Sequence, residues 1–241
     1  MAPSPGDARY HANVDPHRRH SVLADVVLGA QDGLVNVLGV VLGVAAATDS
    51  VRIVVVAGLA AALADSTSMA AVAYTSRLAA GSLYESEKAR EHRHVRTVPA
   101  IEREEIRAMF AAKGFSGTLL EQIVATITAN EDVWVEAMMA EEHGLAPVDR
   151  RTSLRAALVV GVASVVGSAI PLAPFAAAPV HLASWLSVAL TAAVLFAGGA
   201  YKARVTVGSW WRSGLELALI GIGSALVGYA IGTLLRAPMA P

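Results

Sequence analysis

Five long apolar stretches dominate the sequence. They cover residues 22–48, 53–80, 154–178, 182–200 and 214–235. Each is near or above the roughly 20 residues that a helix needs to cross the hydrocarbon core of a bilayer. A segment in lipid must satisfy its backbone hydrogen bonds internally, so each stretch is predicted to be helical. The sequence therefore predicts an all-α, polytopic membrane protein with five transmembrane helices.

Composition supports this class and excludes others. Hydrophobic residues make up 55% of the chain, and the formal net charge is -1, which gives no basic signal for a nucleic-acid partner. The absence of cysteine excludes disulfides, thiolate metal ligands and cysteine nucleophiles. The polar N-terminus lacks an apolar run after a basic start, so we expect no cleaved signal peptide.

A polar block, 81–152, separates the second and third apolar stretches and holds most of the Lys, Arg and Glu residues. Its periodicity predicts three amphipathic helices, with the first continuing the second span, the second covering 99–114 and the third covering 116–144. The predicted organisation is a tail at 1–21, two spans within 22–80, a helical domain at 81–152, three spans within 153–236 and a tail at 237–241.

The basic residues predict an orientation. They precede the first span and fill the link between the fourth and fifth spans, at Lys202, Arg204 and Arg212, whereas the link between the third and fourth has none. The positive-inside rule then places the N-terminus and the polar block in the cytoplasm. We expect an integral protein of the plasma membrane.

The first two spans carry polar side chains where lipid is expected. Asp32 and Asn36 share one helical stripe with Asp25, which we expect to be hydrated near the interface, and Asp65 and Met69 share one face of the second span. An ionisable residue in a span costs roughly 2.5–3.5 kcal/mol on insertion scales. No Lys or Arg lies near Asp32 or Asp65 in the sequence. The missing counter-charge is therefore expected to be a proton or a transported cation.

Residues of the polar block could bind that cation. Glu91 and His94 are three residues apart, as are Glu102 and Glu105, and Met138, Met139 and Glu142 can face one point. Carboxylates combined with thioether and imidazole suit a divalent ion such as Fe²⁺ or Zn²⁺. Two ordinary alternatives remain open, since Glu residues usually form solvated faces with i,i+4 partners and Met residues usually fill cores.

Several motifs together resemble the vacuolar iron transporter family over nearly the whole chain. They are "GAQDGLVNVLGVVLG" in the first span, "ADSTSMAAVAYTS" in the second and "MMAEEHGL" at the end of the polar block. The resemblance implies a dimeric five-span carrier that exchanges Fe²⁺, and Mn²⁺ or related ions, for protons. It implies that Asp32 and Met69 lie on the translocation path. It also implies that the polar block, 81–152, is a cytoplasmic three-helix metal-binding domain. The ligands that it implies there are Glu91, Glu102, Glu105, Met138, Met139 and Glu142.

The chain departs from the family pattern at two positions. Plant members carry Glu in the second span where this chain has Ala61, and Asp65, one turn later on the same face, is expected to substitute. The second Glu of the first cytoplasmic helix falls on His94, which joins the expected ligands. An imidazole ligand would make metal affinity fall as pH drops towards histidine protonation.

The function expected from the sequence is export of divalent metal from the cytoplasm by proton antiport, with no enzymatic activity. Bound Fe²⁺, or Mn²⁺, Zn²⁺ or Co²⁺, is expected as cargo, with no permanent cofactor, and the path is expected to use Asp32, Asn36, Asp65 and Met69. The expected partners are metal ions, protons, the lipid bilayer and a second copy of the chain. Two alternatives are a membrane-anchored di-iron ferroxidase, which would need two Glu-x-x-His motifs where we find one, and a membrane protein that stores metal or binds protein partners.

Overall fold

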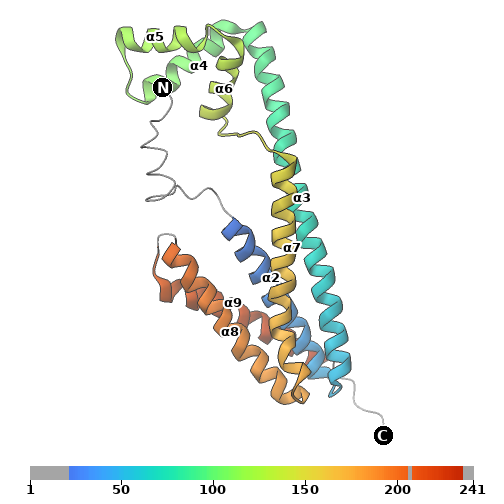
Figure 1. Cartoon of the computed structure of the whole chain (residues 1–241). Coiled ribbons are helices and arrows are strands. Elements are labelled where there is room, and N and C mark those ends of the chain that lie inside the picture. The colour runs from blue at the N-terminus through green and yellow to red at the C-terminus, as the bar shows by residue number, and fades with distance from the viewer. Residues whose placement is uncertain (1–21, 206–207, 236–241) are drawn as a thin grey trace, which may run out of the picture. The chain divides into compact units, whose positions relative to one another are not determined.

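The computed structural model describes residues 22–205 and 208–235, and these are helical with no strand (Figure 1). The chain divides into two compact units. We call Met1–Ala73 with Arg155–Pro241 the membrane unit and Tyr74–Leu154 the polar unit. The predicted tails at 1–21 and 237–241 lie outside the described residues.

Five helices are long and apolar enough to cross a membrane, as the sequence predicts. They are α2 (Val22–Ala47), α3 (Val51–Thr97), α7 (Arg150–Leu172, followed by the short η1, Ala173–Ala176), α8 (Val180–Val205) and α9 (Trp210–Leu234). Helix α3 has 47 residues and contributes to both units, so the second apolar stretch continues without a break into the polar block.

Glycines let α2 pack closely on two neighbours. A Cβ atom at Gly33 would lie 2.3 Å from the carbonyl oxygen of Ser164 in α7. One at Gly228 in α9 would lie 2.0 Å from the carbonyl oxygen of Gly39, and one at Gly232 equally close to that of Gly43. These small-xxx-small pairs bring helix backbones into contact, as expected of helices in lipid. Within one chain they hold α2 between α7 and α9.

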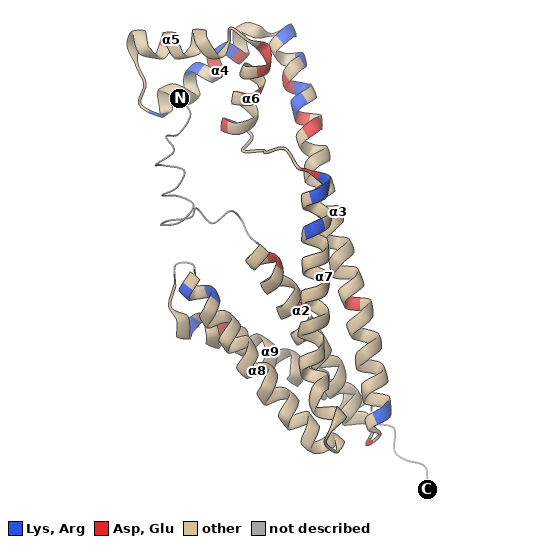
Figure 2. Cartoon of the chain, viewed as in Figure 1, with Lys and Arg blue, Asp and Glu red and all other residues tan. Residues whose placement is uncertain are grey.

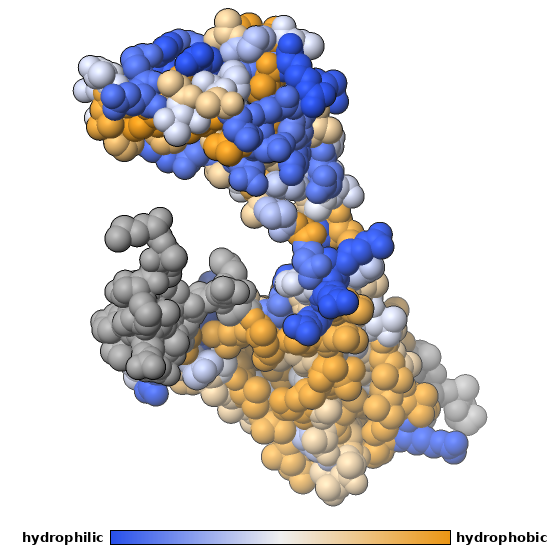
Figure 3. All heavy atoms as spheres, turned by 45° about the horizontal axis from the view of Figure 1, so that its top comes forward, coloured by the Kyte–Doolittle hydropathy of each residue, from blue (hydrophilic) through white to orange (hydrophobic). Residues whose placement is uncertain are grey.

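The outer surface of the membrane unit is apolar. Leu63, Val162 and Leu226 are each more than 60% exposed, and the face of the unit seen in Figure 3 is largely hydrophobic. A water-soluble protein rarely exposes apolar patches of such extent. This surface is suited to contact with lipid tails.

Charged residues concentrate in the polar unit (Figure 2). The unit combines the end of α3 with α4 (Pro99–Ala112), α5 (Gly117–Ile127) and α6 (Glu131–Glu141). Its hydrophobic core gathers Tyr84, Val95, Ile106, Leu120, Val124, Trp134, Val135, Met138 and Met139.

The prediction of a single third helix over 116–144 is wrong, because the structure divides this segment into α5 and α6. Asn130 causes the break. Its side-chain oxygen accepts hydrogen bonds from the backbone N–H groups of Asp132 at 2.9 Å and Val133 at 3.2 Å, so it caps the start of α6. The polar block therefore holds α4, α5 and α6 beside the end of α3.

Candidate metal and ion-pathway sites

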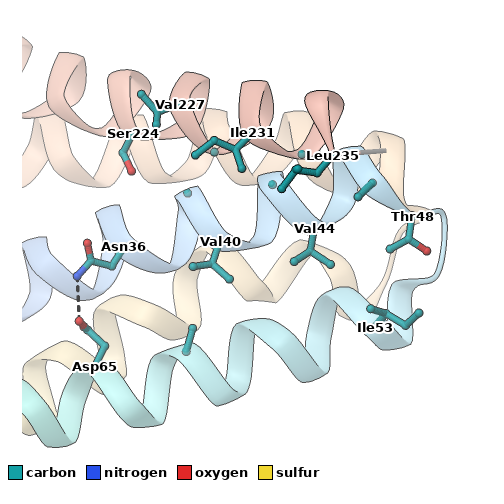
Figure 4. A pocket seen from close by; sticks show the side chains of 16 residues that line it. Asn36, Val40, Val44, Thr48, Ile53, Asp65, Ser224, Val227, Ile231 and Leu235 are labelled. Carbon is teal, nitrogen blue, oxygen red and sulfur yellow. Dashed lines mark hydrogen bonds between the residues drawn. The ribbon is translucent and has the colours of Figure 1, made fainter. Parts of the chain in front are cut away.

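A polar cluster joins three helices inside the membrane unit. Asn36 of α2 donates from Nδ2 to Oδ1 of Asp65 in α3 at 2.9 Å (Figure 4). The Ser164 hydroxyl of α7 donates to the other oxygen of Asp65 at 3.2 Å, and the Ser66 hydroxyl donates to Ser164 at 2.9 Å. The described partners of Asp65 are thus an amide and a hydroxyl. They orient the carboxylate without neutralising it.

Asp32 lies beside this cluster. Its carboxyl group is within hydrogen-bonding reach of Asp65 and Asn36. Two carboxylates that share an apolar site repel each other unless a proton or a cation lies between them. Met69 is half-buried one helical turn after Asp65. The structure therefore brings together three of the four predicted pathway residues, Asp32, Asn36 and Asp65.

An open groove of about 820 Å³ runs along Asn36 and Asp65, whereas Asp32 and Met69 do not line it. It lies between α2, α3 and α9. Figure 4 shows Asn36 and Asp65 facing one end of it, while mostly apolar side chains, together with Thr48 and Ser224, line the rest. Ala61 also lines the groove. The position at which plant relatives are expected to carry Glu therefore faces the same space as Asp65.

Sequence reasoning missed the two serines of the cluster. Ser66 is 4% exposed and Ser164 is fully buried. A weak signal was available, because Ser164 and Ser168 are four residues apart and therefore share one face of an otherwise apolar helix.

A second cluster lies in the polar unit. Glu91 of α3 and Glu102 of the first turn of α4 are each only 3% exposed. His94 places Nδ1 at 3.4 Å from Oε1 of Glu102 and 3.8 Å from Oε1 of Glu91. One potential ligand atom from each of the three residues lies within 4.8 Å of the others, the spacing of a metal site.

Both buried glutamates carry an unsatisfied oxygen. Oε2 of Glu91 and Oε2 of Glu102 are inaccessible and have no hydrogen-bond partner. A charged carboxylate in this position is unfavourable unless a proton or a cation binds it. Burial, aided by the neighbouring Glu105 and Glu91, raises the pKa of Glu102 to about 7. This cluster is therefore poised to exchange a proton for a cation.

Glu105 and Glu142 belong to the same acidic group. Glu105 lies within hydrogen-bonding reach of Glu102. Partial burial raises the pKa of Glu142, and the Glu105 and Glu91 carboxylates add to the rise. Four carboxylates from α3, α4 and the end of α6 thus converge.

Met138 and Met139 are 0% and 2% exposed and belong to the hydrophobic core of the polar unit. Such burial is also what an ordinary core role predicts. Their role as metal ligands stays a prediction.

Comparison with known proteins identifies the family. A profile described as the VIT family matches residues 23–233. The chain belongs to the VIT family. The VIT-family chain is 31% identical over 201 residues to vacuolar iron transporter 2 of Oryza sativa subsp. japonica, covering 83% of this chain and 82% of that relative. It is 28% identical over 211 residues to vacuolar iron transporter 1 of Tulipa gesneriana, covering 87% and 85% of the two chains.

A more distant similarity reaches a parasite protein. The VIT-family chain is 26% identical over 242 residues to the vacuolar iron transporter of Plasmodium falciparum, with 94% of this chain and 88% of the relative covered. These matches confirm the resemblance drawn from the sequence motifs. Together with the five apolar helices they identify an integral membrane protein.

Proposed function

We propose that this chain carries divalent iron across a membrane in exchange for protons. The observation that carries the proposal is the pair Asp32 and Asp65, two interacting carboxyl groups within an apolar unit. The described partners of these two carboxyl groups include no basic side chain. Relatives that match most of the chain are named vacuolar iron transporters. A divalent cation would neutralise the pair in one state, and protons would neutralise it after the ion leaves.

The polar unit supplies the ion in this proposal. Its capture site comprises Glu91, His94, Glu102, Glu105, Met138, Met139 and Glu142. The unsatisfied oxygens of Glu91 and Glu102 support it, since a bound cation would satisfy both. Carboxylate, imidazole and thioether ligands suit Fe²⁺ and also Mn²⁺, Zn²⁺ and Co²⁺. The pathway through the membrane unit then uses Asp32, Asn36, Asp65 and Met69.

We propose that the transporter is a homodimer. The groove between α2, α3 and α9 is open, and Asn36 is exposed in it beside Asp65. A polar pair cannot face lipid tails without a large cost. A second copy that covers this groove would shield the pair and leave a polar path between the protomers.

The orientation that we propose places the polar unit in the cytoplasm. Arg204 lies 5.9 Å from the ring centre of Trp210, and Arg212 lies 5.7 Å from that of Trp211. Such pairing of basic and aromatic side chains is typical of a membrane interface, and basic residues favour the cytoplasmic side. The plasma membrane is the host expected from the sequence, whereas the relatives' names contain the word vacuolar. Localisation of a tagged chain in its own cell decides between these membranes.

Transport can be tested in liposomes that contain the purified protein and an imposed pH gradient. The unmodified chain should move Fe²⁺ against the proton flow. Asp32→Asn should abolish this movement because it removes one charge of the pair. Asp49→Asn is the matched control, since Asp49 is exposed in the link after α2 and does not line the groove. If Asp32→Asn moves iron as fast as the unmodified chain, the proposed pathway is wrong.

The ferroxidase alternative is weaker. The relatives are named as transporters, so we infer that the chain is not an enzyme. Iron-dependent oxygen consumption by the purified protein would contradict this inference.

A further inference from the structure

Glu87 and His143 form a second group of potential ligands around Glu91. One potential ligand atom from each of Glu87, Glu91 and His143 lies within 4.8 Å of the others. This second group shares only Glu91 with the first. Neither Glu87 nor His143 belongs to the capture site proposed above.

Only one of the two carboxylate oxygens of Glu91 has a hydrogen-bond partner. Its side chain is 4% exposed, and Nε2 of His143 lies 3.2 Å from its Oε1. Oε2 of the same carboxylate is inaccessible and has no hydrogen-bond partner. The imidazoles of His94 and His143 both approach Oε1, while Oε2 has no partner. Glu91 therefore offers ligand positions to two groups of potential ligands, as a carboxylate that bridges two cations does.

The chain fixes His143 in this position through a turn at the end of α6. Gly144 has φ +61°, a conformation that favours glycine. The N–H of Leu145 donates to the carbonyl oxygen of Met139 at 3.0 Å and closes the turn. The backbone around His143 is thus held, and its ring reaches α3 at Glu91.

One basic side chain competes for Glu87. The Arg90 guanidinium lies 2.9 Å from Oε2 of Glu87, and that oxygen has no hydrogen bond of good geometry. The Arg90 side chain is 51% exposed, whereas that of Glu87 is 14% exposed. An exposed i,i+3 ion pair contributes little. Arg90 can therefore turn into water when a cation binds Glu87.

We propose that Glu87, Glu91 and His143 bind a second divalent cation, and that Glu91 bridges it to a cation held with His94 and Glu102. The proposal rests on the metal-capture role of the polar unit described above. Two carboxylates and one imidazole suit Fe²⁺, Mn²⁺, Zn²⁺ or Co²⁺. A pair of ions that share a carboxylate in this way typically lie about 3.5–4 Å apart. The polar unit would then present ions as a pair.

Electron paramagnetic resonance of the full-length protein, purified in detergent and loaded with Mn²⁺, tests the pair directly. Two Mn²⁺ ions bridged by Glu91 should give a spin-coupled spectrum. His143→Ala should leave the uncoupled signal of single ions, and zinc titration should show one fewer Zn²⁺ per chain. Glu87→Gln should do the same without altering the turn at Gly144. His92→Gln is the matched control, since His92 pairs with Glu131 and belongs to neither group.

Two results would overturn the pair. One is a coupled spectrum that survives both His143→Ala and Glu87→Gln. The other is the absence of spin coupling in unmodified protein loaded with Mn²⁺, together with an unchanged number of bound Zn²⁺ ions in both variants. The liposome assay separates this failure from failure of the proposed function. Iron transport without a coupled pair rejects only the second site, whereas a coupled pair without transport rejects the transport proposal.

Discussion

At the scale of single residues, the protonation of Glu102 makes the folding stability of the metal-free protein depend on pH. Burial holds its pKa at about 7, whereas an ordinary glutamate has a value of 4.5. Between these values the folded state binds a proton that the unfolded chain has released. The contribution of Glu102 to stability is therefore fully present below about pH 4.5 and is lost as pH rises to about 7.

We predict that the melting temperature of the metal-free protein falls as pH rises from about 5 to about 8. Glu102→Gln should reduce this fall because the amide stays neutral, and Zn²⁺ should raise the melting temperature of the unmodified chain at the higher pH. Thermal unfolding followed by circular dichroism measures both effects. Glu136→Gln, at an exposed position of α6, is the control. The same pH dependence in Glu102→Gln and unmodified protein would contradict the assignment.

Asp65 and Ala61 give a second prediction at this scale. The two residues are one turn apart on α3 and both line the groove. Asp65→Asn should slow iron transport at least about tenfold, since hydrogen bonds and contacts to a charged group are worth roughly 1.5–3 kcal/mol. Adding Ala61→Glu should restore transport, because a carboxylate returns to the same space. Failure of Ala61→Glu to rescue Asp65→Asn, with normal membrane insertion, would show that Asp65 acts through its own partners, Asn36 and Ser164.

At the residue level, the sequence singled out side chains that the structure brings together where a side chain is rare in its context. Asp32, Asn36 and Asp65 stood out because lipid-spanning segments seldom contain them, and the structure brings them together. Ser66 and Ser164 did not stand out, because serine in a helix can satisfy its hydroxyl on its own backbone. His143 stayed outside the predicted ligand set because its contact is with Glu91, 52 residues earlier in the chain, which helical spacing does not reveal.

At the scale of elements, the long apolar runs determine the five membrane helices closely. The predicted first span at 22–48 corresponds to Val22–Ala47, and the fifth at 214–235 to Trp210–Leu234. The break between α5 and α6 was not predictable from apolar spacing. Neither Pro nor Gly marks it, and its cause is the cap that Asn130 provides. A polar cap in the middle of a continuous amphipathic pattern becomes visible only through its hydrogen bonds.

Helix packing by glycine gives the prediction at this scale. A Cβ at Gly228 would meet the backbone of α2 at 2.0 Å, whereas one at Gly223, on the same helix, would meet nothing within 4 Å. Gly228→Ala should lower stability by about 1–3 kcal/mol, the usual cost of overpacking, and Gly223→Ala should leave it unchanged. Thermal stability of the two variants in detergent measures the difference. Equal stability of both variants would mean that α2 and α9 do not pack through these glycines.

At the scale of the whole molecule, each unit holds acidic groups that have no Lys or Arg partner among the described residues. The polar unit places them beside Glu91 and Glu102, in water-accessible helices rich in charge, whereas the membrane unit places Asp32 and Asp65 among apolar helices. A site in contact with water can bind ions at low concentration. A site in an apolar unit controls whether the ion crosses. The two units are therefore expected to govern different kinetic quantities.

We predict that variants of the two units separate in iron-transport kinetics. Glu102→Gln should raise the iron concentration for half-maximal transport at least about tenfold, the scale on which loss of a supporting group weakens a metal site, while the maximal rate changes little. Asp32→Asn should abolish the maximal rate at any iron concentration. Initial rates in liposomes over a range of Fe²⁺ concentrations measure both quantities. Abolished transport by Glu102→Gln at saturating iron, in protein that inserts normally, would instead place the polar-unit site on an obligatory path, because capture alone can be bypassed by raising the ion concentration.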